Sequence, residues 1–193
     1  MLRKFLNLGD FGKITSSKYI LNAESSGSLH DGLKHNVNYV SSEYFGGEYK
    51  SGDIVGGVLN VNLTDSHFVE NTFDIVLTSD VFEHIPDPYR AFKEVRRILK
   101  PGGVHIFTIP FYQTSYSDEN RAEIIDGEIK YHMEPIYHLD PLNPSGILVY
   151  NIFSMEMLLK LNKIGFYTMM HKLYDIRYGI LGNNGIIFES RKV

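Results

Sequence analysis

The chain has 193 residues, of which 43% are hydrophobic, and this length is enough for one well-buried domain but short for two. Its formal net charge is −4 with both signs interspersed, so nucleic acid is not expected as its main partner. It contains no cysteine, no apolar run of about 18 residues and no secretory signal pattern, which excludes disulfides and a membrane-spanning helix and predicts a cytoplasmic protein.

Apolar runs alternate with helical patterns along the first third of the chain. We expect strands at residues 18–23, 38–42 and 55–62, a short helix at 28–35, and an irregular stretch at 46–57. This alternation is typical of a mainly parallel sheet covered by helices on both faces. We treat residues 1–193 as a single domain that begins with a short N-terminal segment, 1–17.

The segment from residue 72 to 111 is the most informative part of the sequence. Residues 73–77 are apolar and rich in β-branched side chains, which predicts a strand buried on both faces. Asp87 is a candidate helix N-cap between two prolines, and the helix that follows repeats apolar residues along one face. Pro101 and two glycines are expected to end it, and residues 104–109 form the next strand. The segment therefore predicts one parallel βαβ unit, with carboxylates where its first strand ends.

The last part of the chain begins with an irregular segment. Residues 112–150 are rich in aromatics, histidines and prolines without periodicity, which indicates a substrate-side insertion or lid. An apolar helix follows and ends near Gly165. Residues 166–173 and 185–190 are expected to form the closing strands, with a tight turn at 182–185.

Four motifs occur together in a fixed order: SSEYF from Ser41, FDIVLTSDVFEHIPDP from Phe73, FKEVRRILKPGG from Phe92 and HIFTIPF from His105. In this combination the sequence resembles the class I S-adenosylmethionine-dependent methyltransferases over roughly residues 18–189. The resemblance implies an α/β, Rossmann-like doubly wound fold with a mainly parallel, seven-stranded sheet whose last strand is antiparallel. It also implies S-adenosylmethionine as cofactor and S-adenosylhomocysteine as product, bound across the carboxyl ends of the strands.

The resemblance also implies which strand ends hold the cofactor. A carboxylate after the second strand accepts both ribose hydroxyls, a polar acceptor after the third strand faces adenine, and the end of the fourth strand lies against the amino-acid moiety. The residues at these positions are Glu43, Tyr44, Asn62, Leu63, Ser79 and Asp80. Asn62 stands where an aspartate is common in such families, so an amide oxygen replaces a carboxylate there.

The first loop departs from the pattern that the resemblance implies. An acidic residue and two or three glycines are expected after the first strand, whereas this chain has Asn22, then Glu24, Ser25 and Ser26, and retains only Gly27. We interpret the last four as a variant cofactor loop. A decayed pocket is the alternative and would make the chain an inactive binding or regulatory subunit. A nicotinamide-dependent oxidoreductase ranks third, because the loop lacks G-x-G-x-x-G.

The chemistry of the acceptor side is less specific. Asp80, Glu83 and His84 form D-x-x-E-H, which suits metal ligands, but we favour hydrogen bonds that organise the corner and assign no metal. His84 is the candidate catalytic base, and His132 and His138 are candidate substrate residues in the 112–150 insertion.

We expect the methyl acceptor to be a hydroxyl on a sugar, glycan or small metabolite. In-line transfer from a sulfonium needs mainly positioning and exclusion of water, so few side chains are obligatory. The insertion could instead supply a homo-oligomer interface, because aromatic residues on loops serve both purposes. The tyrosines that suggest this are Tyr112, Tyr116, Tyr131 and Tyr137.

Overall fold

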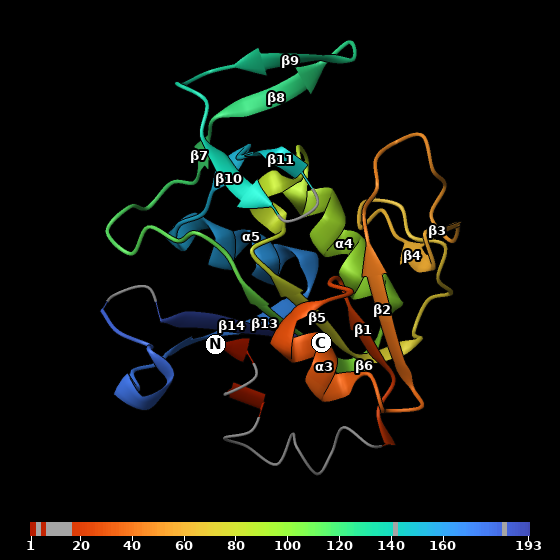
Figure 1. Cartoon of the computed structure of the whole chain (residues 1–193). Helices are drawn as coiled ribbons and strands as arrows, with labels where there is room; N and C mark the ends of the chain where they lie inside the picture. The colour runs from red at the N-terminus through yellow and green to blue at the C-terminus, as the bar shows by residue number, and fades with distance from the viewer. Residues whose placement is uncertain (3–4, 7–16, 141–142, 183–184) are drawn as a thin grey trace.

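The computed structural model describes residues 1–2, 5–6, 17–140, 143–182 and 185–193. Its centre is an eight-stranded sheet with the order β13-β14-β6-β5-β1-β2-β4-β3 (Figure 1). The strands are β1 (Ile20–Asn22), β2 (Tyr39–Glu43), β3 (Ile54–Val55), β4 (Val58–Asn60), β5 (Phe73–Ser79), β6 (Leu99–Thr108), β13 (Phe166–Lys172) and β14 (Ile186–Lys192). Strand β14 runs antiparallel to both β6 and β13, which confirms a mainly parallel sheet with an antiparallel last strand.

The sheet has one strand more than the seven predicted. Residues 55–62, expected as one strand, form a hairpin in which β3 pairs antiparallel with β4, and β4 pairs parallel with β2. Gly56 and Gly57 have φ angles of 58° and 88°, the left-handed backbone that a two-residue hairpin turn requires. The prediction of a single strand was wrong because this G-G turn signal was not used.

Helices cover both faces of the sheet. Successive residues of β5 point to opposite sides, so that Ile75 packs with α3 (Gly27–Leu33) while Val76 packs with α4 (Pro88–Ile98) and α5 (Met155–Ile164). Leu2 and Leu6 join the cluster on the α3 face. Residues 3–4 and 7–16 of the predicted N-terminal segment lie outside the described residues. Among the helices that are described, none has the length and apolar character needed to cross a membrane.

The predicted βαβ unit is present as β5, α4 and β6. The side chain of Asp87 accepts a hydrogen bond of 3.0 Å from the backbone N–H of Arg90, which confirms the N-cap. Pro101 and the glycines after it do not form the predicted turn, because β6 begins directly after α4 and contains them. The sheet accommodates them in a bulge of β6. Phe73 pairs with Leu99 and Ile75 pairs with Val104, so β6 contains more residues than β5 between these two pairs.

The insertion (residues 112–150) is more regular than the sequence predicted. It contains the hairpin of β8 (Ala122–Ile125) with β9 (Glu128–Tyr131) and the pair of β10 (Tyr137–Asp140) with β11 (Asn143–Leu148). A third pair joins β7 (Glu119–Asn120) to β12 (Asn151–Ile152). The signal that was missed is Asp126-Gly127, where both residues have positive φ and form the β8–β9 turn. The prediction of an irregular backbone was therefore wrong, and the role of the insertion as a lid stays a prediction.

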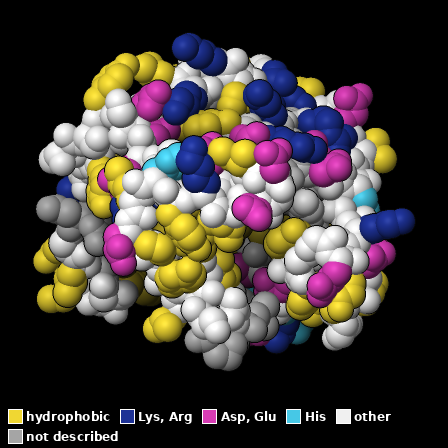
Figure 2. All heavy atoms as spheres, turned by 90° about the horizontal axis from the view of Figure 1, so that it is seen from above, with side chains coloured by type: hydrophobic (Ala, Val, Ile, Leu, Met, Phe, Trp, Pro, Cys, Tyr) yellow, Lys and Arg dark blue, Asp and Glu magenta, His cyan; other side chains and the backbone are white. Residues whose placement is uncertain are grey.

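The β8–β9 hairpin stands away from the sheet at the top of Figure 1. It exposes Ile124, Ile125 and Ile129 to solvent. Seen from above in Figure 2, hydrophobic side chains are visible on this face, and Lys and Arg lie among Asp and Glu. A role of this region in homo-oligomer formation stays a prediction.

The closing elements agree with the sequence. Helix α5 begins after Ser154 and ends at Gly165, whose φ of 100° gives the left-handed C-cap that glycine favours. Strands β13 and β14 pair along their whole length. Two residues of the predicted turn at 182–185, namely 183 and 184, lie outside the described residues.

Candidate functional site

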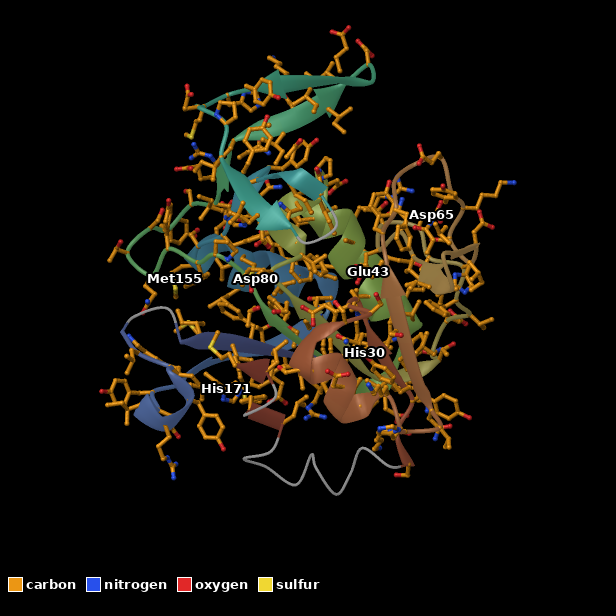
Figure 3. The ribbon with its side chains drawn as sticks, viewed as in Figure 1. His30, Glu43, Asp65, Asp80, Met155 and His171 are labelled. Carbon is orange, nitrogen blue, oxygen red and sulfur yellow. The ribbon has the colours of Figure 1, made fainter. Side chains whose placement is uncertain are left out.

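Strands β1, β2, β4 and β5 end at one edge of the sheet, which we call the carboxyl rim. At the end of β2, one carboxylate oxygen of Glu43 accepts hydrogen bonds from the backbone N–H and the hydroxyl of Ser25, at 2.8 and 2.9 Å. The other oxygen, Oε2, accepts none from the described residues. Figure 3 labels Glu43 and Asp80 at this edge. The variant first loop is thus tied directly to the residue predicted to bind ribose.

Glu24 lies in the same place. Burial, followed by the negative charges of Glu43 and Asp80, raises the pKa of the Glu24 carboxyl from 4.5 to about 7. The side-chain amide of Asn22 donates a 3.0 Å hydrogen bond to the Glu24 carbonyl and a 2.9 Å bond to the Tyr39 hydroxyl. These bonds hold the loop so that three carboxyl groups gather at the carboxyl rim.

Asp80 adopts a conformation that is rare for residues other than glycine. Its φ angle is 51°, in the left-handed region, directly after β5 ends. Thr108 holds it there, because its hydroxyl donates to the Asp80 carboxylate at 3.1 Å and its carbonyl accepts from the Asp80 N–H at 3.0 Å. Ser79 lies beside them, 3.2 Å from the Thr108 hydroxyl. Thr108 was not predicted; it comes from the neighbouring strand, and only the β5–β6 register shows its role.

A pocket of about 380 Å³ lies beyond the ends of β2 and β4. Tyr44, after β2, and Asn62, after β4, both line it, and both were predicted to contact the cofactor. However, the Asn62 side-chain oxygen already accepts from the backbone N–H and hydroxyl of Thr64, at 2.9 and 2.8 Å. Leu63 is 6% exposed and belongs to the apolar core. The pocket therefore lies beside Tyr44, whereas the Asn62 oxygen and the Leu63 side chain, the two groups expected near adenine, make other contacts.

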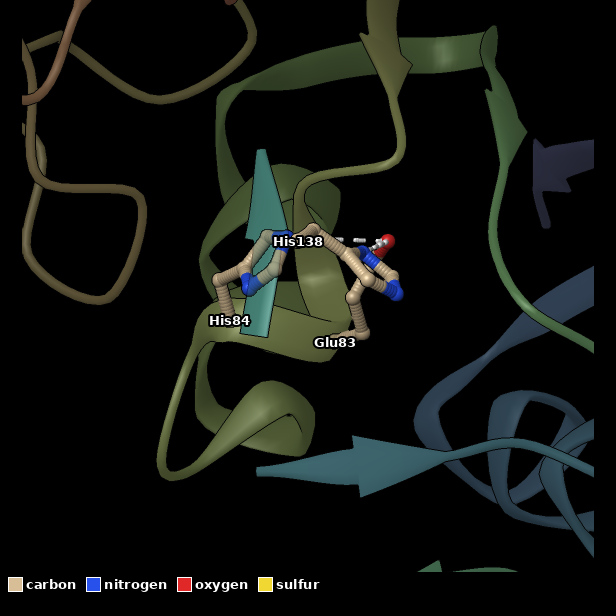
Figure 4. A group of neighbouring side chains, drawn as sticks. All are labelled: Glu83, His84 and His138. Atoms are coloured by element: carbon tan, nitrogen blue, oxygen red, sulfur yellow. Dashed lines mark ion pairs between the residues drawn. The ribbon is translucent and has the colours of Figure 1, made fainter. Parts of the chain in front are cut away.

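A second polar group lies where the turn η2 (Phe82–His84) meets β10. The Glu83 side chain is 0% exposed, and neither carboxylate oxygen has a hydrogen-bond partner among the described residues. Its Oε1 lies 3.8 Å from His84 Nε2 and 3.6 Å from His138 Nδ1 (Figure 4). Burial is the main cause that raises the pKa of the Glu83 carboxyl from 4.5 to about 8.

The grouping of these residues differs from the one considered in the sequence. Asp80 does not belong to the described cluster, and His138 takes its place. The contact could not be foreseen, because it depends on how β10 folds back over η2. His132 lies apart, with its Nε2 3.0 Å from Glu123 beside the β8–β9 hairpin. The two histidines predicted to share one substrate wall therefore have separate surroundings.

As a base, His84 has a restricted geometry. Its Nδ1 lies 2.8 Å from the carbonyl oxygen of Leu148, and because that oxygen only accepts, Nδ1 must carry the proton. In the neutral ring the lone pair is then on Nε2, which faces Glu83. The side chain is 14% exposed.

Comparisons with known proteins identify a family match for the central part of the chain. Residues 37–107, which include β2, β4, β5 and most of β6, match the methyltransferase domain family model. A glycine/sarcosine/dimethylglycine N-methyltransferase of Actinopolyspora halophila is 33% identical over 89 residues, 46% of this chain. The match spans only 14% of that relative's own length.

Solved structures agree on the fold. An S-adenosylmethionine-dependent methyltransferase from Mesorhizobium loti superposes with a TM-score of 0.58 at 13% identity, covering 95% of this chain and 97% of that one. A Burkholderia thailandensis 1,6-didemethyltoxoflavin-N1-methyltransferase, crystallised with its substrate and S-adenosylhomocysteine, gives 0.53 at 13% identity, covering 98% and 81%. The family match, the curated relative and the solved structures all point to methyltransferases, as do the sequence motifs. Residues 37–107 thus match the methyltransferase domain, and the whole chain has the fold of S-adenosylmethionine-dependent methyltransferases of known structure.

Proposed function

We propose that this chain binds S-adenosylmethionine at the carboxyl rim and transfers its methyl group to a small molecule. The observation that carries the proposal is the gathering of Glu24, Glu43 and Asp80 where the parallel strands end. A cation gains most from such a site, because three carboxyl groups held together repel one another until a positive charge enters. S-adenosylmethionine brings a sulfonium, an ammonium group and a ribose diol.

The residues present fit this ligand. Glu43 keeps Oε2 for the ribose hydroxyls while Ser25 fixes its other oxygen. Tyr44 lines the neighbouring pocket, whose lining also includes Tyr49 and His67, and these rings suit a purine base. Ser26 and Gly27, at the start of α3, and Ser79 and Asp80, at the end of β5, flank the space for the amino-acid moiety.

The same charges argue against a dinucleotide. A nicotinamide cofactor carries an anionic pyrophosphate, which needs backbone N–H groups in a glycine-rich loop. Here the first loop contributes Glu24, close enough to Glu43 and Asp80 for their charges to raise its pKa. We therefore set the oxidoreductase alternative aside.

Methyl transfer asks the chain mainly to position two molecules. The bound sulfonium supplies an activated methyl group, so that the bond to sulfur breaks as the bond to the acceptor forms. The chain holds the acceptor in line with the methyl group and excludes water. The insertion, with β10 packed against η2, is the element that would form the acceptor's wall. The role of His84 as base and the substrate roles of His132 and His138 stay predictions.

For the acceptor we propose a hydroxyl of a sugar or small metabolite, with an amine as the second candidate. The Actinopolyspora relative favours the amine, because it is a glycine/sarcosine/dimethylglycine N-methyltransferase. Incubating the protein with S-adenosylmethionine and matched pairs of hydroxyl and amine compounds separates the two. Mass spectrometry then detects the added methyl group and, by fragmentation, the atom that carries it.

Calorimetry tests cofactor binding itself. The wild-type chain and the variants Glu43→Ala and Glu128→Ala are each titrated with S-adenosylmethionine and with S-adenosylhomocysteine. Glu128 is an exposed carboxylate on β9, so its loss is the matched control for charge. We expect micromolar affinity for the wild type and Glu128→Ala, and a loss of at least about tenfold for Glu43→Ala. Absence of binding at millimolar ligand would instead favour the inactive binding or regulatory subunit.

A further inference from the structure

The Glu83 carboxyl group is the least satisfied polar side chain near the carboxyl rim. It is 0% exposed, and both of its oxygens lack a hydrogen-bond partner among the described residues. Leaving a buried carboxyl group without partners is costly, and native structures provide such groups with donors or cations. Because neither ribose binding nor methyl transfer involves Glu83, this group calls for an explanation of its own.

Two imidazole nitrogens face the same carboxylate. His84 Nε2 is 3.8 Å and His138 Nδ1 is 3.6 Å from Glu83 Oε1, and all three ligand atoms lie within 4.8 Å of one another. The residues come from two elements, η2 and β10, that are far apart in the sequence. Figure 4 shows the two rings and the carboxylate converging.

His84 makes one contact of the kind that metal-binding histidines make. Its Nδ1–H donates to the carbonyl oxygen of Leu148 at 2.8 Å, which orients the ring and leaves the Nε2 lone pair directed at Glu83. Metal-binding histidines almost always donate their second ring N–H in this way, because the bond fixes both the tautomer and the ring orientation.

We propose that Glu83, His84 and His138 bind one divalent cation of the zinc class. Two imidazole nitrogens and one carboxylate oxygen suit a borderline ion such as Zn²⁺ better than Mg²⁺ or Ca²⁺, which prefer oxygen ligands. Bond lengths of about 2.0–2.2 Å place neighbouring ligand atoms of a tetrahedral ion roughly 3.3–3.5 Å apart. The Glu83 oxygen already lies 3.8 and 3.6 Å from the two nitrogens, and the two nitrogens, which lie within 4.8 Å of each other, would move closer together when the ion binds. The cation also neutralises the buried carboxylate.

Three protein ligands leave one coordination position of a tetrahedral ion for water or another oxygen donor. The His138 side chain is 40% exposed, so the site opens toward solvent on the β10 side. The ion would join the insertion to the turn after β5. It would also occupy the lone pair of His84, which replaces the predicted base role of that residue with a ligand role.

Metal binding to the untagged full chain tests the proposal without reference to cofactor or acceptor. Protein stripped with EDTA and dialysed is titrated with Zn²⁺ by calorimetry, and bound metal is counted by mass spectrometry after gel filtration. The variants are His138→Ala, Glu83→Gln and the control His132→Ala, which removes another histidine of the insertion from outside the cluster. Co²⁺ serves as a spectroscopic probe, since its visible bands report imidazole coordination.

The expected result is one ion per chain with a micromolar or tighter dissociation constant in the wild type and in His132→Ala. His138→Ala and Glu83→Gln should each weaken binding by more than about tenfold and change the Co²⁺ spectrum. Circular dichroism in EDTA checks that the variants fold, and His138, being partly exposed, is the safer of the two. No stoichiometric uptake by the wild type, or unchanged affinity in His138→Ala, would overturn the proposal. Because the readout is the metal, this result is independent of cofactor binding.

Discussion

Replacing Glu24 with glutamine should stabilise the ligand-free protein at alkaline pH and lower its affinity for S-adenosylmethionine. Glu24 is partly buried beside Glu43 and Asp80, and these surroundings raise the pKa of its carboxyl to about 7. Glutamine keeps the size of the side chain and removes its ionisation. The substitution therefore isolates what the charge contributes.

The size of the effect follows from the two pKa values. In the unfolded chain the Glu24 carboxyl ionises near its ordinary pKa of 4.5, and in the folded protein near 7. Wild-type stability therefore falls as pH rises from 4.5 through 7, because the unfolded state releases its proton first. Each pKa unit is worth about 1.4 kcal/mol, which gives about 3 kcal/mol before screening. Solvent around this partly exposed group reduces the expected difference to about 1–2 kcal/mol.

Urea unfolding at pH 5 and pH 8.5 measures this difference. Glu24→Gln should lie within about 0.5 kcal/mol of the wild type at pH 5 and exceed its free energy of unfolding by about 1–2 kcal/mol at pH 8.5. In calorimetry at pH 8.5 the variant should lose more affinity for S-adenosylmethionine than for S-adenosylhomocysteine, since only the former carries the sulfonium charge. Glu128→Gln, on the exposed face of β9, controls for a general change in charge. A stability difference that does not vary with pH would refute the argument.

Three further substitutions probe the scaffold. Phe92→Ala should lower the free energy of unfolding by about 3–5 kcal/mol in urea titrations, because the ring is fully buried among other aromatics. Burial lowers the pKa of His105 to about 3, so stability present above pH 6.5 is lost as pH falls toward 3; urea unfolding at pH 7 and pH 4.5 should therefore show a smaller fall in the free energy of unfolding for His105→Leu than for the wild type. Gly165→Ala should lower the melting temperature more than Gly127→Ala, because both have positive φ but only at 165 would a Cβ lie 2.6 Å from Arg96 Nε.

Much of the sheet could be predicted from the sequence, because buried parallel strands and one amphipathic helix leave strong local patterns. The strand over residues 73–77 and the Asp87 cap were identified from residue type and spacing alone. The predicted element boundaries were wrong where a glycine lies within a strand or a hairpin and does not mark the end of a helix. Gly102 lies in a strand bulge and Gly127 in a hairpin turn, and both have positive φ.

The candidate site was less accessible to sequence reasoning. Glu43 could be singled out because it follows the second predicted strand, where the resemblance to class I methyltransferases implies an acidic residue. Its bonds to Ser25 could not, since they depend on how the first loop folds back over β2. The same holds for His138, which reaches Glu83 only because β10 packs against η2. Local patterns place residues on strand ends, whereas the partners of a side chain depend on tertiary contacts.

The geometry of the first loop bears on whether the departure from glycines reflects adaptation or decay. A loop that had lost its role would have no reason to contact Glu43, the residue predicted to bind ribose. Instead, Ser25 donates two hydrogen bonds to Glu43, and Asn22 fixes the Glu24 carbonyl. Glu24 also places a carboxyl group where its ionised form destabilises the fold, a combination more typical of binding sites than of inert surface. These contacts favour a loop that recognises its ligand by charge where glycine-rich loops use backbone approach.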